Sequence, residues 1–146
     1  SIAASMLTDA STDMYKKLLD EEIINSSFAS EVFYGDGYFT VIFSGESDKP
    51  EIVRKSLSNE IGRIIADGLN EKDFARIKKS TYGALIRELN NVEAVANLLI
   101  NAHMDGVSPY DTINVLSELT SGDVYEFIKN ELCEDKTVLS VIKGDG

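Results

Sequence analysis

The chain has 146 residues, of which 43% are hydrophobic, and its 25 acidic side chains against 14 basic ones give a formal net charge of −11. This length and composition fit one domain, or one piece of a larger one, with an ordinary apolar core. The acidic balance argues against nucleic acid as a partner, because phosphate binding depends on clustered lysine and arginine. It also argues against docking on anionic lipid, and no apolar run approaches the roughly 20 residues that span a bilayer.

The content of cysteine and histidine excludes several kinds of site. Cys133 is the single cysteine, so an internal disulfide is excluded and a reduced, cytoplasmic setting is favoured. His103 is the single histidine and lies far from Cys133 in the chain, whereas zinc normally takes three or four protein ligands. We therefore expect no metal ligand and no catalytic residue here, with Cys133 half-buried at a helix end and His103 near a helix C-terminus.

The first segment has the apolar spacing of one amphipathic helix. Its apolar residues recur every three or four positions: Ala3, Leu7, Ala10, Met14 and Leu18. This spacing predicts a single helix of about five turns. The acidic residues that follow, from Asp20 to Glu22, are typical of a solvated helix end rather than of a carboxylate site.

Residues 27–45 predict the hairpin on which the other elements pack. In its second arm Phe39, Val41 and Phe43 alternate with Tyr38, Thr40 and Ile42. Such alternation of aromatic and β-branched residues is typical of a strand with two different faces. The turn Gly35-Asp36-Gly37 tolerates positive φ, which predicts antiparallel pairing of the two arms.

Five helices and a short strand are predicted after the hairpin. Pro50 suits the first turn of the first helix and Gly68 its C-terminal cap, and Thr120 with Asp123 forms a capping box before the last helix. The predicted helices cover residues 50–68, 70–89, 93–106, 108–119 and 120–132, and the predicted strand covers residues 137–142. This order predicts an α+β fold, in which a mainly antiparallel sheet of hairpin plus C-terminal strand is covered by helices on one face.

Six segments, in this order, resemble the pitrilysin/insulinase family of zinc metallopeptidases, and more narrowly a bacterial subgroup of paired peptidase-like proteins. They are Y-K-K-L-L-D-E-E-I-I-N-S-S-F (15–28), F-S-G-E-S-D-K-P-E (43–51), L-N-E-K-D-F-A-R-I-K-K (69–79), L-I-R-E-L-N-N-V-E-A-V-A-N (85–97), L-T-S-G-D-V (119–124) and V-L-S-V-I (138–142). The resemblance covers nearly the whole chain and rests on the order of the segments rather than on one motif.

The resemblance implies a domain like that of the mitochondrial processing peptidase, of the C-terminal, non-zinc-binding type, over residues 1–146 and lacking its first strand. In this family one copy of the domain carries the inverted zinc motif, and another helps to close a chamber around an extended peptide. The resemblance thus implies a longer zinc-dependent endopeptidase, whose zinc lies in a homologous domain or subunit outside this chain. The sheet edge that a missing strand would expose also predicts a homodimer.

The same resemblance gives the candidate substrate-contact residues Leu19, Ser26 and Ser27. Active members of the family often place an arginine and, seven residues later, a tyrosine before the hairpin, where they hold the substrate backbone or the zinc-bound intermediate. Leu19 and Ser26 stand at these positions, and no arginine occurs between Ser1 and Val53. An alternative is therefore a non-catalytic homologue that acts as a scaffold or partner subunit, and a third is an unrelated α+β binding module.

Overall fold

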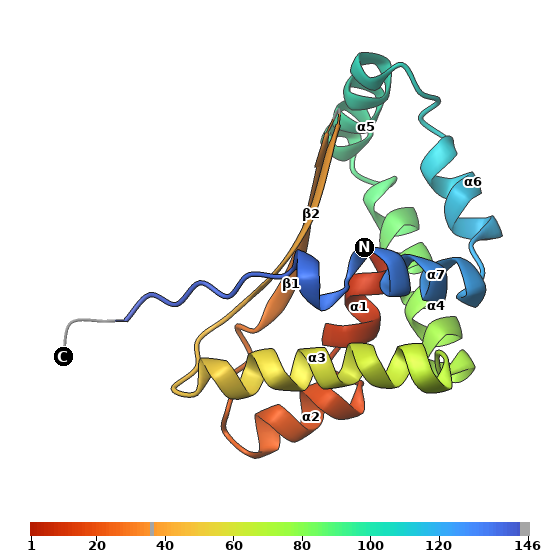
Figure 1. Cartoon of the computed structure of the whole chain (residues 1–146). Helices are drawn as coiled ribbons and strands as arrows, with labels where there is room; N and C mark the ends of the chain where they lie inside the picture. Colours follow the sequence, from red (N-terminus) through yellow and green to blue (C-terminus); the bar gives the residue numbers. More distant parts are fainter. Residues whose placement is uncertain (36, 144–146) are drawn as a thin grey trace.

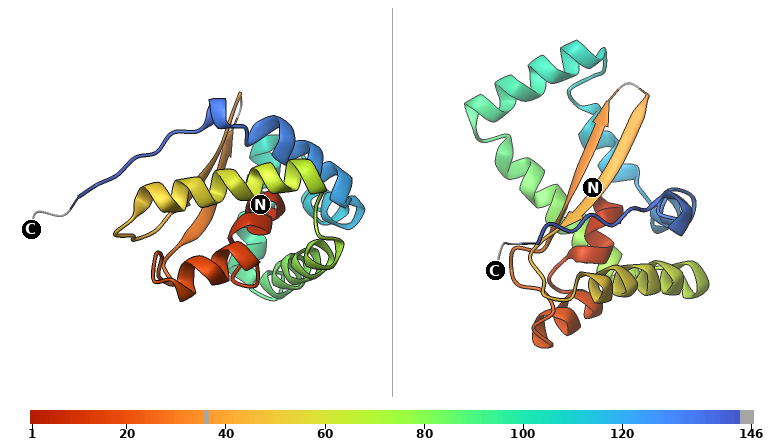
Figure 2. Two further views of the ribbon diagram at one scale, coloured as in Figure 1. Left: turned by 60° about the horizontal axis from the view of Figure 1, so that its bottom comes forward. Right: turned by 60° about the vertical axis from the view of Figure 1, so that its left-hand side comes forward.

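The computed structural model describes residues 1–35 and 37–143, without the side chains of Asp105 and Glu134. A hairpin rises from a group of helices, with α4 to α7 on one side of it, while the C-terminal segment extends past the other side (Figures 1 and 2). The elements are α1 (Ile2–Thr8), α2 (Asp13–Asp20), β1 (Ala29–Gly35), β2 (Tyr38–Ser44), α3 (Pro50–Asp67), α4 (Glu71–Glu88), α5 (Val92–Asp105), α6 (Asp111–Glu118), α7 (Ser121–Glu131) and a 3-10 turn at Glu134–Lys136. This arrangement confirms the predicted α+β fold.

The predicted first helix is wrong in one respect, because the structure divides it into α1 and α2. Four polar or small residues at 9–12 stop α1 and start α2. Asp9 Oδ1 accepts the backbone N–H of Ser11 at 3.0 Å, and Thr12 Oγ1 donates to the Asp9 carbonyl at 2.9 Å. Thr12 also caps α2 by accepting the N–H of Tyr15 at 3.4 Å. These local hydrogen bonds compete with the helix and override the continuous apolar stripe.

The hairpin is confirmed, with the predicted two faces. Strands β1 and β2 pair antiparallel, Val32 facing Val41. Val41 and Phe43 pack against the buried core, and the ring of Phe39 meets that of Phe127 on α7 edge-on, with centroids 5.2 Å apart. Asp36, in the predicted turn, lies outside the described residues.

Helices α3, α4 and α7 begin or end at the residues that their caps predict, and α5 begins at Val92, one residue before the predicted start. Pro50 is the first residue of α3, and Gly68 follows its end with a φ of 85°. Asn70 and Asn91 cap α4 and α5 through their side-chain oxygens. The capping box before α7 is complete, because Thr120 donates its N–H to Asp123 Oδ2 at 2.8 Å and accepts the N–H of Asp123 at 3.2 Å.

The buried side chains form two clusters that share partly buried neighbours. The main core joins α1, α3, α4, α6 and α7, and consists of Ile2, Ala3, Met6, Leu7, Ile61, Ile64, Phe74, Ile77, Leu116, Val124, Ile128 and Leu132. The second core joins α2, the segment after it and the start of α3, and consists of Met14, Tyr15, Leu18, Ile23, Ile24, Phe28 and Val53. Phe43 and Leu57 pack against both clusters, so the hairpin is held to both.

The predicted C-terminal strand is wrong for the part of the chain that the structure describes. Residues 137–143 have no regular secondary structure, and the sheet of residues 1–35 and 37–143 consists of β1 and β2. Val138 is 94% exposed and Ile142 is 95% exposed. The β-branched residues of this segment have high strand propensity, but propensity does not form a strand without a ladder partner.

Within the described residues, no helix is both long and apolar enough to cross a bilayer.

Candidate functional site

The candidate substrate-contact residues lie at the end of α2 and in the segment that leads to β1. Leu18 is 2% exposed and belongs to the second core, whereas Leu19 is 40% exposed on the outer side of α2. The carbonyl of Leu18 accepts the N–H of Ile23 at 2.9 Å and that of Ile24 at 3.3 Å, which turns the chain back at the helix end. Glu22 takes the left-handed conformation that this reversal needs, with a φ of 54°.

A hydrogen-bonded turn around Asn25 fixes the two candidate serines. Asn25 Oδ1 accepts the N–H of Ser27 at 2.8 Å and its hydroxyl at 2.5 Å. Asn25 Nδ2 donates to Glu46 Oε2 at 2.9 Å, which joins the turn to the loop after β2. Sequence reasoning missed the turn itself, although an asparagine two residues before a serine is a signal for such a turn. Ser26 and Ser27 are exposed on a segment that is held at both sides.

The side chains of the second core pack against this segment and hold it in place. Phe28 is 6% exposed, and its ring lies against that of Tyr15, with centroids 6.4 Å apart. Gly45 approaches so closely that a Cβ atom there would stand 2.8 Å from the Cα of Phe28. The segment thus offers a partner one exposed apolar side chain and two serines on a fixed backbone. Leu19 and Ser26 supply neither a guanidinium nor a phenol, so their side chains cannot take the part that an arginine and a tyrosine have at these positions.

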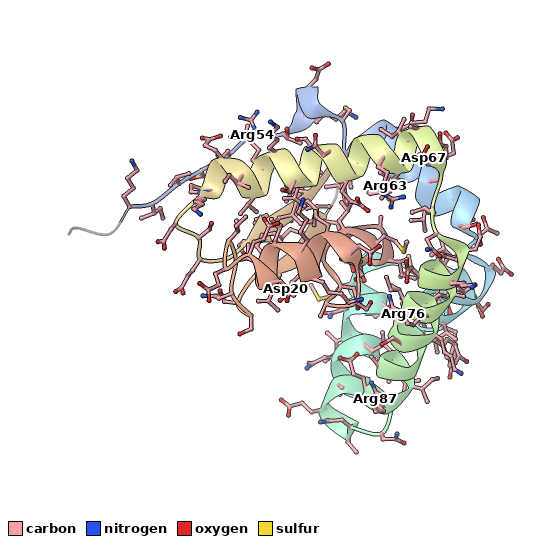
Figure 3. All side chains as sticks on the ribbon, turned by 90° about the horizontal axis from the view of Figure 1, so that it is seen from below. Asp20, Arg54, Arg63, Asp67, Arg76 and Arg87 are labelled. Atoms are coloured by element: carbon pink, nitrogen blue, oxygen red, sulfur yellow. The ribbon has the colours of Figure 1, made fainter. Side chains whose placement is uncertain are left out.

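All four arginines of the chain lie on α3 and α4, as Figure 3 shows. Arg76 contacts Asp9 at 3.2 Å and Asp73 at 3.3 Å, and Arg63 contacts Glu60 at 2.7 Å. Desolvation opposes ionisation of Asp9, but hydrogen bonds from Ser11 and Arg76 outweigh it and lower the pKa of Asp9. Arg76 therefore joins α4 to the end of α1, whereas the ion pair of Arg63 lies within α3, and neither arginine stands before the hairpin.

The side chains do not fit a zinc ion in the described part of the chain. His103 is exposed in the last turn of α5, as predicted, and Cys133 is half-buried after α7, with its Sγ 3.9 Å from the Asn130 carbonyl. Within residues 1–35 and 37–143, leaving aside the side chains of Asp105 and Glu134, no three His, Cys, Asp or Glu side chains come together in a group that could hold a metal ion. Zinc chemistry in this chain would need donors that these residues do not bring together.

Comparison with known proteins shows the family. Residues 1–81, more than half of the chain, match the peptidase M16 inactive domain. The chain therefore belongs to the peptidase M16 family and carries its inactive domain, which confirms the resemblance stated above. The crystal structure of an M16-like peptidase from Alicyclobacillus acidocaldarius shares the fold, with a TM-score of 0.85 over 92% of this chain at 20% identity.

A relative named an uncharacterized zinc protease, YmfH of Bacillus subtilis (strain 168), is 23% identical over 133 residues, or 90% of this chain. The matched region is 31% of that relative and 33% of the Alicyclobacillus peptidase. The chain thus spans about a third of the length of both proteins. The comparisons therefore show the family and the fold of this chain, which is a domain of an M16 peptidase homologue.

Proposed function

We propose that residues 1–146 are the C-terminal-type domain of a longer cytoplasmic zinc metallopeptidase that cleaves peptides. The chain forms a wall of the substrate chamber, opposite a zinc-bearing homologous domain or subunit. The match of residues 1–81 to the inactive domain of the family carries this proposal. The name of the Bacillus relative, a zinc protease about three times as long as the matched region, supports zinc in the longer protein.

The residues of the chain suit the part of a wall rather than that of a catalyst. Leu19, Ser26 and Ser27 present apolar surface and hydroxyl groups on a backbone that Asn25 and the second core hold in place. Binding energy from such groups orients a peptide, while the zinc and its general base act from the other domain.

The test compares this chain alone with the longer protein on an unfolded, quenched fluorescent peptide, each with and without a zinc chelator. We expect cleavage by the longer protein, its loss in chelator, and no cleavage by this chain alone at any zinc concentration. Chelator-sensitive cleavage by this chain alone would refute the proposed division between the two domains.

A second candidate is a non-catalytic homologue that serves as a scaffold or partner subunit. Leu19 and Ser26 at the positions of the arginine and tyrosine favour it, as does the absence of arginine before Arg54. The two candidates differ in the sequence of the partner domain, because a catalyst requires an H-x-x-E-H motif there. If the partner domain lacks the motif and the longer protein cleaves nothing, the scaffold function holds.

A further inference from the structure

Two segments of the chain meet at the base of the hairpin, one coming from α2 and the other leading to α3. Where the ladder between β1 and β2 ends, the two backbones are still close, because a Cβ atom on Gly45 would stand 2.8 Å from the Cα of Phe28. Beyond this contact Asn25 Nδ2 donates to Glu46 Oε2 at 2.9 Å. This hydrogen bond, the Asn25–Glu46 bridge, therefore links the two segments outside the sheet.

The two polar atoms of the Asn25 side chain make opposite kinds of hydrogen bond. Oδ1 accepts the N–H of Ser27 at 2.8 Å, and a backbone N–H can only donate. Nδ2 faces the carboxylate of Glu46, which can only accept when it is ionised. A carboxylate at position 25 would keep the first bond and lose the second, because two carboxylates repel each other. An amide is therefore required at position 25 to make the turn and the bridge at the same time.

The bridge sets where the exposed backbone of Ser26 and Ser27 lies relative to the hairpin. The turn around Asn25 is local, since its hydrogen bonds stay within residues 25–28. The bridge attaches this turn to the loop after β2, which the close approach of Gly45 to Phe28 holds beside it. A hydrogen bond to an ionised group is stronger than one between neutral groups, so it can keep this register even in an exposed position.

We propose that Asn25 is a positioning residue, which acts through Glu46 and holds the backbone of Ser26 and Ser27 at the place where a bound peptide meets it. This inference rests on the proposed function, because it takes the two serines as contacts of the peptide. A wall that is ordered before binding lowers the entropic cost of binding the peptide. Loss of the bridge therefore weakens peptide binding, while the zinc chemistry of the other domain continues unchanged.

The test measures kcat and KM of the longer protein separately, in steady-state cleavage of the quenched fluorescent peptide. Asn25→Asp keeps the acceptor for Ser27 and breaks the bridge, so KM should rise about three- to fivefold while kcat stays within about twofold. When Asn25→Asp is combined with Glu46→Gln, the new amide donates to the new carboxylate and the bridge forms in reverse. KM should then return to within about twofold of the unchanged protein. Glu46→Gln alone leaves a weaker, neutral acceptor and should raise KM by less than about twofold.

Asn91→Asp is the matched control, because it adds the same charge at another exposed asparagine. Asn91 caps α5 through its side-chain oxygen, a contact that a carboxylate retains, so KM and kcat should stay within about twofold. Circular dichroism checks that each variant is folded.

Three results would overturn this inference and leave the proposed function standing. They are cleavage with an unchanged KM or mainly a lower kcat in Asn25→Asp, a KM that the double variant does not restore, and an equal rise of KM in Asn91→Asp. No zinc-dependent cleavage by the unchanged longer protein would instead refute the proposed function, and this inference with it.

Discussion

Adjacent leucines on α2 allow a sharp test of how the second core supports the α2–β1 segment. Leu18 is 2% exposed and Leu19 is 40% exposed. In Leu18→Ala, about three buried carbon groups are lost at ~0.8 kcal/mol each, and a cavity adds to this, so we expect a loss of about 3 kcal/mol. In Leu19→Ala the site is already partly hydrated and solvent fills the space, so we expect about 1 kcal/mol. Helix propensity changes little in either variant.

Urea unfolding, followed by far-ultraviolet circular dichroism, measures the difference between the two variants. The chain has no tryptophan, but tyrosine fluorescence gives a second probe, because Tyr15 is 6% exposed in the same cluster. For a domain of this size, the Tm should fall by about 6–12 °C for Leu18→Ala and by about 3 °C for Leu19→Ala. Equal losses in the two variants, at unchanged m-values, would contradict the burial on which the reasoning rests.

Four further substitutions test other features of the fold. Thr12→Ala removes the cap of α2 and should cost about 1 kcal/mol in urea unfolding. Gly45→Ala should cost about 1–3 kcal/mol, since its Cβ would press on the backbone of Phe28. Gly62→Ala, in an open position inside α3, should instead stabilise by about 0.5–1 kcal/mol, and the same sign for both glycine variants would contradict the packing. The folded-state pKa of Asp9 is lowered, so its contribution is present above about pH 4 and is lost as pH falls through the folded value. Asp9→Asn should therefore flatten the acid loss of stability, measured by unfolding between about pH 5 and pH 2, and an unchanged slope would refute this.

The elements that local chemistry specifies were predictable from the sequence. The hairpin follows from strict alternation around a glycine-rich turn, and α4 and α7 follow from Asn70 and from Thr120 with Asp123. The break between α1 and α2 was missed because the apolar stripe continues through it. Asp9 and Thr12 decide this boundary through hydrogen bonds that outweigh a continuous pattern.

Features that depend on distant parts of the chain were not predictable in the same way. Residues 137–142 have strand composition, but a strand requires a partner that composition cannot specify. The contact between Asn25 and Glu46 joins two loops on either side of the hairpin, and only the folded backbone brings them together. Leu19, Ser26 and Ser27 came from the family resemblance. The structure places them on one segment, and their contact with substrate stays a prediction.

The extended segment at residues 138–143 has a practical consequence for handling the protein. Its side chains are largely in water, and it has no helix or sheet hydrogen bonds that must open before an enzyme can engage its backbone. Trypsin can cut after Lys143 or Lys136, on either side of it, and less specific enzymes can cut within it. Limited digestion should therefore trim this end first and leave the helices and hairpin as a resistant fragment. Within the described residues, a chain from a peptidase family thus carries, at residues 138–143, a segment that a foreign protease can readily reach.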